Sequence, residues 1–512
     1  MPSKILSAAL VGIDAQPVEV EVDLFTGQIP SFHIVGLPDT AVNESKERVS
    51  SAVRNSGASP PHHSNRKVIV NLAPADLKKE GSFYDLPIAV GYLAASGQLQ
   101  TNLPLQDYLF VGELSLEGNT RQANGLLPIA IMAKEIGIKT LFVPEQNASE
   151  AALVNEVEII PVKSLAGLIN HLEGREKILP QEKTNTNKFL EKPNTDFDMA
   201  FVKGQEHAKR ALEIAAAGAH NILFTGPPGS GKTLLARTLP SILPPMSFGE
   251  SLETTKIFSI SGCLPKNTPL ITIRPFRNPH HTASAVSLVG GGANPRPGEI
   301  TLAHRGVLFL DEFPEFSRQV LESLRQPLED GVISVARATR TLSFPARFML
   351  VAAMNPCPCG KLTDPTQDCI CSPGQISKYK RKISGPLMDR IDLHIEVPPV
   401  KYDKLSSEKI SEESAKIRER VIKARTRQKI RFAGLKIKTN SEMGTKEIRK
   451  FCRIDDTTQN LLKNAASQLH LSARSFFRVI KLARTIADLT GEDNIKMPHV
   501  AEALQYRAKE EF

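Results

Sequence analysis

A chain of 512 residues is too long for a single hydrophobic core, so about two to four domains are expected. Its 41% hydrophobic and 23% charged residues are typical of globular proteins, and no apolar run reaches the about 18 residues of a membrane span. The net charge of +9 favours a polyanionic partner only weakly, and the absence of Trp argues against a broad surface for stacking bases.

The N-terminal third alternates between strand-like and helix-like segments, which predicts a domain of mixed α and β structure at 1–172. Strands are expected at 18–24, 67–72, 108–111 and 140–143, and a helix at 126–136. Because the N-terminal apolar stretch runs directly into the first strand, a signal peptide is not expected, and the cytoplasm is the expected location.

The polar segment 173–197 has little apolar periodicity and is expected to be a linker. Residues 198–400 then alternate helices with short apolar strands, which predicts a mostly parallel sheet. The strands are expected at 221–225, 307–310 and 348–353.

A helical domain is expected at 401–512, with Ser411 as the N-cap of its first helix. The apolar stripe of that helix is Ile417, Val421 and Ala424. Its opposite face is basic and consists of Arg418, Arg420, Lys423, Arg425 and Arg427.

The most informative motif is G-x-x-x-x-G-K-[ST] at 226–233, which stands between the strand expected at 221–225 and the start of a helix. Backbone N–H groups of such a loop surround phosphate oxygens, and the helix N-terminus adds its positive end. Lys232 is expected to reach the β- and γ-phosphates, and Thr233 to hold Mg²⁺. The expected ATP-binding residues are Gly226, Pro227, Pro228, Gly229, Ser230, Gly231, Lys232 and Thr233.

Two further strands supply the second half of a phosphate site. Asp311 and Glu312 directly follow the apolar run at 307–310, so the end of a central strand delivers both carboxylates to the phosphates. Asp311 is expected to position Mg²⁺ and Glu312 to polarise the attacking water. Asn355 follows the next strand and is expected to lie beside the γ-phosphate and orient water.

Four cysteines are clustered in one short loop, as Cys357, Cys359, Cys369 and Cys371. Four thiolates can surround a tetrahedral Zn²⁺, although C-x-C is tighter than the common C-x₂-C spacing. The alternatives are two disulfides, which the cytoplasm disfavours, or unligated thiols. Because four protein ligands leave no open position, the expected role of this possible Zn²⁺ is structural.

These motifs resemble the AAA+ ATPases, and four further segments resemble their magnesium-chelatase-like branch and its YifB/ComM family. The segments are Phe276-Arg-Asn-Pro-His-His-Thr282, Leu288-Val-Gly-Gly-Gly292, Pro297-Gly-Glu-Ile-Thr-Leu-Ala-His304 and Gly385-Pro-Leu-Met-Asp-Arg-Ile-Asp-Leu393. The resemblance extends over essentially the whole chain. It implies a P-loop α/β core at 198–400 and a helical lid at 401–512. It also implies an ATP-hydrolysing homohexamer that acts on single-stranded or branched DNA as a branch-migration helicase in natural transformation.

The resemblance also implies roles for three residues outside the loop at 226–233. Asn355 matches the sensor-1 position and Arg474 the sensor-2 arginine of the lid. Arg390 matches the arginine finger, which reaches the γ-phosphate held by a neighbouring subunit. Fixed guanidinium groups stabilise the charge that phosphoryl transfer develops, which agrees with these roles. The alternative is that Arg390 pairs with Asp389 or Asp392 of its own subunit.

Two inserts of this branch are candidates for DNA contact. A hairpin is expected at 331–345 with Arg337 and Arg340 near its tip, and a second insert, 274–296, contains Arg277, His280 and His281. Arginine-tipped hairpins in a ring channel suit sequence-independent tracking of a phosphate backbone. The alternative is that these charges are solvated or pair with a neighbouring subunit.

Segments of the N-terminal domain at 112–118, 125–130 and 137–144 resemble the Lon protease domain, an S5-like α+β fold. That family uses a Ser–Lys dyad. Here Ser82 lies in a segment without the family's small-residue pattern, and Leu127 occupies the expected position of the lysine. Without that base a serine hydroxyl is not activated, so we expect this fold without peptidase chemistry.

The main hypothesis is therefore an ATP-driven hexameric ring that moves on DNA. One alternative is a protein-remodelling ATPase like the magnesium-chelatase subunit, acting on a partner protein. The other is an ATP-dependent Lon-like protease, which Leu127 disfavours.

Overall fold

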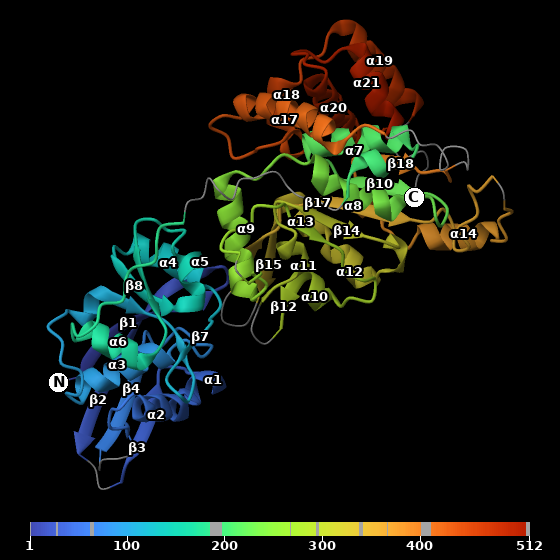
Figure 1. Cartoon of the computed structure of the whole chain (residues 1–512). Helices are drawn as coiled ribbons and strands as arrows, with labels where there is room; N and C mark the ends of the chain where they lie inside the picture. The colour runs from blue at the N-terminus through green and yellow to red at the C-terminus, as the bar shows by residue number, and fades with distance from the viewer. Residues whose placement is uncertain are drawn as a thin grey trace. The chain divides into compact units, whose positions relative to one another are not determined.

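The computed structural model describes residues 2–26, 29–61, 66–184, 197–266, 268–292, 296–336, 341–365, 367–400, 411–469 and 471–507. The chain divides into two compact units, whose elements are labelled in Figure 1. Unit 1 consists of Met1–Leu190 and Phe248–Ile271. Unit 2 consists of Glu191–Ser247 and Thr272–Phe512.

A mixed seven-stranded sheet forms the centre of unit 1, in the order β3-β4-β2-β1-β5-β8-β9. Antiparallel pairing joins β1 to β2 and β2 to β4, and the other neighbours are parallel. The strands are β1 (Ser3–Val11), β2 (Asp14–Thr26), β3 (Ser31–Val35), β4 (Arg66–Ala73), β5 (Tyr108–Phe110), β8 (Thr140–Pro144) and β9 (Glu158–Val162). The strands expected at 18–24, 67–72, 108–111 and 140–143 are all present.

Alternation explains these strands. In β2 the side chains of Val18, Val20 and Val22 are buried, whereas Glu19 and Glu21 point to the opposite face and pair with Lys4 of β1. The helices of the unit are α1 (Thr40–Asn43), α2 (Ser45–Asn55), α3 (Asp85–Ala95), α4 (Leu126–Glu135), α5 (Ala148–Ala151) and α6 (Leu165–Leu172). A small hairpin, β6 (Glu113–Leu114) and β7 (Thr120–Arg121), lies between β5 and α4 in the chain.

Helix α9 (Phe248–Ser261) belongs to unit 1, although the residues before and after its segment belong to unit 2. The backbone N–H of Gly125, at the start of α4, donates to the carbonyl of Ser259 at 3.2 Å. The Ser259 hydroxyl donates to the buried carboxylate of Glu150. Leu270 of the same segment packs in the core of unit 1. The segment 248–271 is thus held by contacts distant in sequence.

A five-stranded parallel sheet forms the centre of unit 2, in the order β11-β14-β17-β10-β18. The strands are β10 (Ile222–Thr225), β11 (Phe276–Arg277), β14 (Val307–Leu310), β17 (Met349–Met354) and β18 (Leu393–Glu396). The strands expected at 221–225, 307–310 and 348–353 are confirmed and lie side by side. Because they are parallel, the segments that follow them meet at one edge of the sheet.

The remaining elements of this α/β core follow the chain. They are α7 (Glu206–Gly218), α8 (Lys232–Ile242), α10 (Ala285–Val289), β12 (Gly290–Gly291), β13 (Arg296–Pro297), α11 (Glu299–Leu302), α12 (Arg318–Ser323), α13 (Arg325–Asp330), β15 (Val332–Ala336), β16 (Thr341–Pro345), α14 (Pro373–Lys380) and α15 (Gly385–Met388). The expected hairpin is present as the antiparallel pair of β15 and β16.

The C-terminal part of unit 2 is helical, as expected. Its helices are α17 (Ser414–Arg431), α18 (Thr445–Phe451), α19 (Asp456–Gln468), α20 (Ala473–Leu489) and α21 (Met497–Gln505). Ile417, Val421 and Ala424 of α17 are buried in the core of unit 2, which confirms the predicted stripe. No helix within the described ranges is long and apolar enough to cross a membrane.

The expected N-cap is wrong, because helix α17 begins at Ser414 and not beside Ser411. The N–H of Ser414 instead donates to the carboxylate of Asp198 at 3.0 Å. Ser411 donates its hydroxyl to the carbonyl of Val202 at 2.9 Å and accepts from Lys209 at 2.8 Å. A carboxylate more than two hundred residues away therefore replaces the local cap.

Candidate nucleotide and metal sites

The loop between β10 and α8 forms a glycine-lined cradle. Gly229 and Gly231 have φ of 77° and 90°, a left-handed backbone that favours glycine. At Gly226 an added Cβ would lie 2.2 Å from the carbonyl oxygen of Val397, so the loop passes β18 too closely for a side chain. These constraints keep the N-terminus of α8 open to the cradle, which is the arrangement that binds phosphate.

The side chain of Lys232 folds back onto the carbonyls of its own loop. Its ammonium donates to the carbonyls of Gly226 and Pro227, at 2.7 and 2.9 Å, and lies 3.3 Å from Oδ1 of Asn355. Burial lowers the pKa of Lys232, and the charge of Asp311 opposes that shift. The contacts bring Lys232 and Asn355 together, as the sequence predicted.

A hydroxyl and a carboxylate that suit Mg²⁺ meet beside the loop. The Thr233 hydroxyl donates to Oδ2 of Asp311 at 2.8 Å. Neighbouring oxygens of an octahedral Mg²⁺ with bonds of 2.0–2.1 Å lie about 2.9 Å apart. These two side chains therefore fit the ion, and Asp311 is further fixed by the N–H of Glu312, which donates to Oδ1 at 3.0 Å.

Glu312 has an unexpected partner, His281, whose Nδ1 lies 3.0 Å from Oε2 of the carboxylate. The His281 ring is about one-third exposed, packs edge-on against Phe316, and stacks on His280 at 4.2 Å between centroids. Glu312 itself has φ of 51°, an unusual left-handed backbone for a residue with a side chain. The insert at 274–292 thus contacts the expected general base, which no local sequence signal indicated.

The two arginines expected at the γ-phosphate converge on one carboxylate of their own chain. Arg390 forms an ion pair with Glu329 and donates to the carbonyl of Pro386 at 2.6 Å. Arg474 lies 4.0 Å from the other oxygen of Glu329. The Arg390 hydrogen bond holds the pKa of Glu329 below its ordinary value. The partner of Arg390 is therefore Glu329, and not Asp389 or Asp392.

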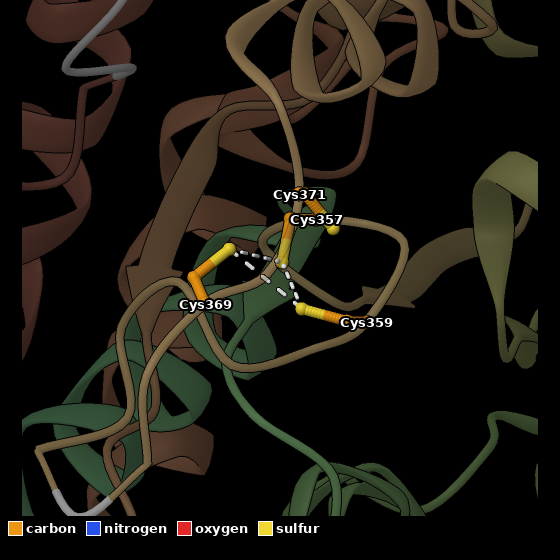
Figure 2. Close-up of side chains that lie close together, drawn as sticks. All are labelled: Cys357, Cys359, Cys369 and Cys371. Atoms are coloured by element: carbon orange, nitrogen blue, oxygen red, sulfur yellow. Dashed lines mark hydrogen bonds between the residues drawn. The ribbon is translucent and has the colours of Figure 1, made fainter.

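The sulfurs of the four clustered cysteines lie close together, and dashed lines join those of Cys357, Cys359 and Cys369 in Figure 2. Cys357 lies 3.4 Å from Cys359 and 3.7 Å from Cys369, and Cys359 lies 3.7 Å from Cys369. All four sulfurs lie within 4.8 Å of one another. A tetrahedral zinc with Zn–S bonds of 2.3 Å requires S···S distances of about 3.8 Å, whereas a disulfide bond measures about 2.0 Å. The cluster therefore fits Zn²⁺ and not disulfides.

The cysteine loop contacts the nucleotide cradle directly. Gly360 has φ of 80°, and an added Cβ would lie 2.6 Å from the ring of Pro228 and 3.8 Å from the side chain of Asn355. A backbone hydrogen bond from Lys361 lowers the pKa of Cys359 to about 6, whereas burial and the neighbouring thiols raise the pKa of Cys369 and of Cys371. A metal at this loop would supply four bonds that fix the Pro228 and Asn355 side of the cradle.

The comparisons with known proteins agree with this geometry. Family models match three segments: magnesium chelatase, subunit ChlI, at 198–405; subunit ChlI of Mg-chelatase at 20–147; and the ChlI C-terminal part at 411–507. Competence protein ComM of Haemophilus influenzae is 46% identical over 506 residues, 98% of this chain and 97% of that protein. The chain belongs to the YifB/ComM family of magnesium-chelatase-like proteins.

Two other relatives show the extent of the similarity. Protein YifB of Escherichia coli is 42% identical over 502 residues, 98% of this YifB/ComM-family chain and 96% of that protein. Lon protease of Rhizobium meliloti is 26% identical over 137 residues, 26% of this chain and 16% of that protein. The likeness to Lon is therefore partial, whereas the YifB/ComM likeness covers nearly the full length.

In unit 1 of this YifB/ComM-family chain, the residues of the possible protease site have other partners. The Ser82 hydroxyl donates to the carboxylate of Glu113. Leu127 is fully buried on α4, at the position expected for the lysine. Lys79, the buried lysine nearest to Ser82 in sequence, donates to the carbonyl of Pro74. These contacts agree with a fold that lacks the Ser–Lys dyad.

Two of the residues predicted to contact DNA, Arg277 and His280, have partners within the chain. Arg277 forms two hydrogen bonds with Glu299, at 2.6 and 2.8 Å, and Nδ1 of His280 lies 2.9 Å from the Thr282 hydroxyl. Arg337 and Arg340 lie outside the described residues.

The basic face of α17 is largely engaged within unit 2. Arg420 pairs with Glu213 and Glu412, and Arg427 pairs with Asp493. Arg418 and Arg425 donate to the main-chain carbonyls of Ser241 and Ala216. This face therefore secures helix α17 to the rest of unit 2.

Proposed function

We propose that the chain is an ATP-hydrolysing motor that assembles as a homohexameric ring, moves along DNA and promotes branch migration during natural transformation. The observation that carries the ATPase part is the meeting of Lys232, Thr233, Asp311 and Asn355 at one edge of the parallel sheet. The competence protein name of its Haemophilus relative supports the role in transformation.

The residues of the cradle suggest how ATP would be cleaved. The ammonium of Lys232 exchanges the carbonyls of Gly226 and Pro227 for phosphate oxygens. Mg²⁺ held by Thr233 and Asp311 would neutralise charge that develops on the phosphates. Glu312 accepts a proton from the attacking water, and Asn355 orients that water. Arg474 of the lid and Arg390 of a neighbouring subunit stabilise the transferred phosphoryl group.

The zinc site serves a structural role in this proposal. The four cysteines hold the loop that contacts Pro228, so the metal would keep the cradle in shape and take no part in the reaction. The domain layout is proposed as a Lon-like domain at 1–172, a linker at 173–197, an ATPase core at 198–400 and a lid at 401–512, with the segment 248–271 of the core range packed in unit 1. The Lon-like domain is a scaffold or guide for DNA in this arrangement.

DNA contact is assigned to the hairpin of β15 and β16, whose connecting residues include Arg337 and Arg340. Arginines on such a hairpin in each subunit would line a ring channel and bind the phosphate backbone without reading sequence. The salt bridge of Arg277 with Glu299 makes the insert at 274–292 a weaker candidate for this contact.

A second candidate function is a protein-remodelling ATPase that acts on a partner enzyme, as the magnesium chelatase family models suggest. The protease alternative is disfavoured, because Leu127 is buried where a lysine is needed and Ser82 is bound to Glu113.

An ATPase assay with and without forked or four-way DNA tests the proposal. We expect branched DNA to stimulate hydrolysis, and the labelled strands of a four-way junction to be exchanged only in the presence of ATP. A Glu312→Gln variant should still bind ATP but lose at least about 100-fold in kcat, because its side chain cannot accept the proton. Branched DNA that neither binds nor stimulates the enzyme would refute the DNA motor and favour the remodelling ATPase.

A further inference from the structure

The backbone around Arg390 is held by hydrogen bonds to three successive carbonyls. The carbonyl of Ile391 accepts from Arg478 at 2.8 Å, and the carbonyl of Asp389 accepts from the other arm of the same guanidinium. The carbonyl of Arg390 accepts from the side chain of Asn221 at 2.9 Å. Asn221, which directly precedes β10, and Arg478 of α20 therefore hold this short segment, and Nε2 of His394 on β18 lies 3.1 Å from the carbonyl of Ile391.

Arg478 lies on lid helix α20, four residues after Arg474 and so on the same helix face. Its side chain is 12% exposed, and its guanidinium lies 3.6 Å from the carboxylate of Asp389 and 3.8 Å from that of Asp392. A planar guanidinium that bridges two carbonyls fixes their orientation as well as their position. Arg478 thus fixes the carbonyls of the residues directly before and after Arg390.

A buried network supports the same segment next to Arg478. The Oδ2 atom of Asp392 lies 3.1 Å from Nδ1 of His220, and Nε2 of this histidine lies 2.8 Å from the hydroxyl of Thr485 on α20. His220 is fully buried. The lid helix therefore contacts the 389–392 segment both directly, through Arg478, and through His220.

The side chain of Arg390 is held less firmly than its backbone. It donates to the carbonyl of Pro386 and pairs with Glu329, whose side chain is about half exposed. Its buried Nε has no hydrogen-bond partner among the residues that the structure describes. The guanidinium can therefore leave Glu329 for another anion, provided that the backbone presents it correctly.

We propose that Arg478 is a positioning residue for Arg390, which sets the finger that one subunit offers to the nucleotide of its neighbour. Because Arg478 belongs to the lid, a movement of the lid over its own nucleotide shifts the Arg390 backbone in the same subunit. The state of one ATP site is thereby passed to the next site around the ring. This inference rests on the proposed function, in which Arg390 acts on the neighbouring subunit.

Mixed rings test the assignment. Donor subunits carry Glu312→Gln, so they cannot hydrolyse ATP but still supply Arg390. Acceptor subunits carry Arg390→Ala, so they can hydrolyse ATP only when a donor supplies the finger. Each variant alone should be inactive, and the mixture should regain ATPase activity. Adding Arg478→Ala to the donor should reduce the regained activity by at least about tenfold, because a small misplacement of a catalytic group costs that much or more.

The position of the change separates a positioning role from a structural one. Arg478→Ala in the acceptor should leave the regained activity nearly unchanged, and Arg478→Lys in the donor should give an intermediate loss. Arg425→Ala is the matched control, since Arg425 also links a lid helix to a core carbonyl, that of Ala216, but does not contact the Arg390 segment. Mixtures in which the donor also carries this change should regain the same ATPase activity as mixtures with the unmodified donor.

Two results would overturn the assignment in different ways. Equal losses with Arg478→Ala in donor and acceptor, or no loss in either, would show that Arg478 does not position the finger. A failure of the unmodified donor and acceptor to restore activity, with mixed assembly confirmed by native mass spectrometry, would refute the finger in trans itself. That second result contradicts the proposed function and with it this inference.

Discussion

Among single residues, His281 changes its expected role most. It was a candidate for DNA contact, but its ring is 3.0 Å from the carboxylate that is expected to activate water. Releasing Glu312 from this contact should change hydrolysis more than DNA binding. The segment that carries His281 therefore contacts Glu312, the residue expected to activate water.

We expect His281→Ala to lower the DNA-independent kcat for ATP by about fivefold to tenfold, because Glu312 loses a hydrogen bond that orients it. Steady-state ATPase assays and DNA titrations at fixed salt measure the two effects separately. His280→Ala is the comparison variant: it removes the ring that lies against His281 but leaves the contact of His281 with Glu312, so its effect on kcat should be smaller. Weakened DNA binding with unchanged basal hydrolysis would support the original assignment of His281 to DNA.

Glu329 is the other decisive residue, because it binds Arg390 and lies near Arg474 in the same chain. The Glu329 side chain is about half exposed, so solvent screens this ion pair and its contribution is about 1 kcal/mol. We therefore expect Glu329→Gln to raise kcat by no more than about fivefold at neutral pH, since Arg390 is released more easily. Glu322→Gln, which removes a similar pair with Arg325, should not change kcat.

The pH dependence of the same pair has a defined sign. Arg390 holds the pKa of folded Glu329 below its ordinary value, so the pair stabilises the protein above the unfolded pKa of about 4.3. That contribution is lost as the pH falls through the folded pKa. Thermal unfolding of wild type and Glu329→Gln should therefore differ at neutral pH and converge in acid. A difference that grows in acid would contradict this pairing.

At the scale of elements, the cysteine loop is tied to the nucleotide cradle through Gly360 and Pro228. Cys369→Ser should lower zinc affinity by at least about tenfold and weaken ATP binding, since the loop is no longer fixed. Native mass spectrometry gives the metal content, and fluorescent nucleotide titration gives the affinity. Cys263→Ser, outside the cluster, should retain one zinc per chain; loss of zinc without any change in ATP affinity would show that the two sites are independent.

The elements themselves were largely predictable, because their signals are local. Apolar runs at 221–225 and 307–310 are followed by residues whose chemistry is specific to phosphate and Mg²⁺, so both strands and site could be located. The contacts of Ser414 with Asp198 and of His281 with Glu312 could not, since the partners lie far apart in the chain. The role of Glu329 could not be predicted either, because its helix has no distinctive motif and its partner Arg390 lies far away in the sequence.

At the scale of the whole molecule, the proposed ring divides one reaction between two chains. In this proposal each subunit would use Lys232, Asp311 and Glu312 for its own ATP and would offer Arg390 to its neighbour. Residues 389–392 are held by Arg478 of the lid, so the donor part of one site and the sensor part of the next share a single helix. Hydrolysis in such a ring depends on the order of events around it.

The segment that contains helix α9 interrupts unit 2 in the sequence but packs in unit 1. The segment 248–271 leaves unit 2 just after α8, contributes Leu270 to the core of unit 1, and returns to unit 2 before β11. A gene cut in the linker at 173–197 would thus yield neither unit intact: one fragment would lack a helix, and the other would carry it without Gly125 and Glu150. The N-terminal domain cannot be exchanged by recombination at a single junction. A chimera that takes its N-terminal domain from a relative would therefore have to exchange the segment 248–271 as well.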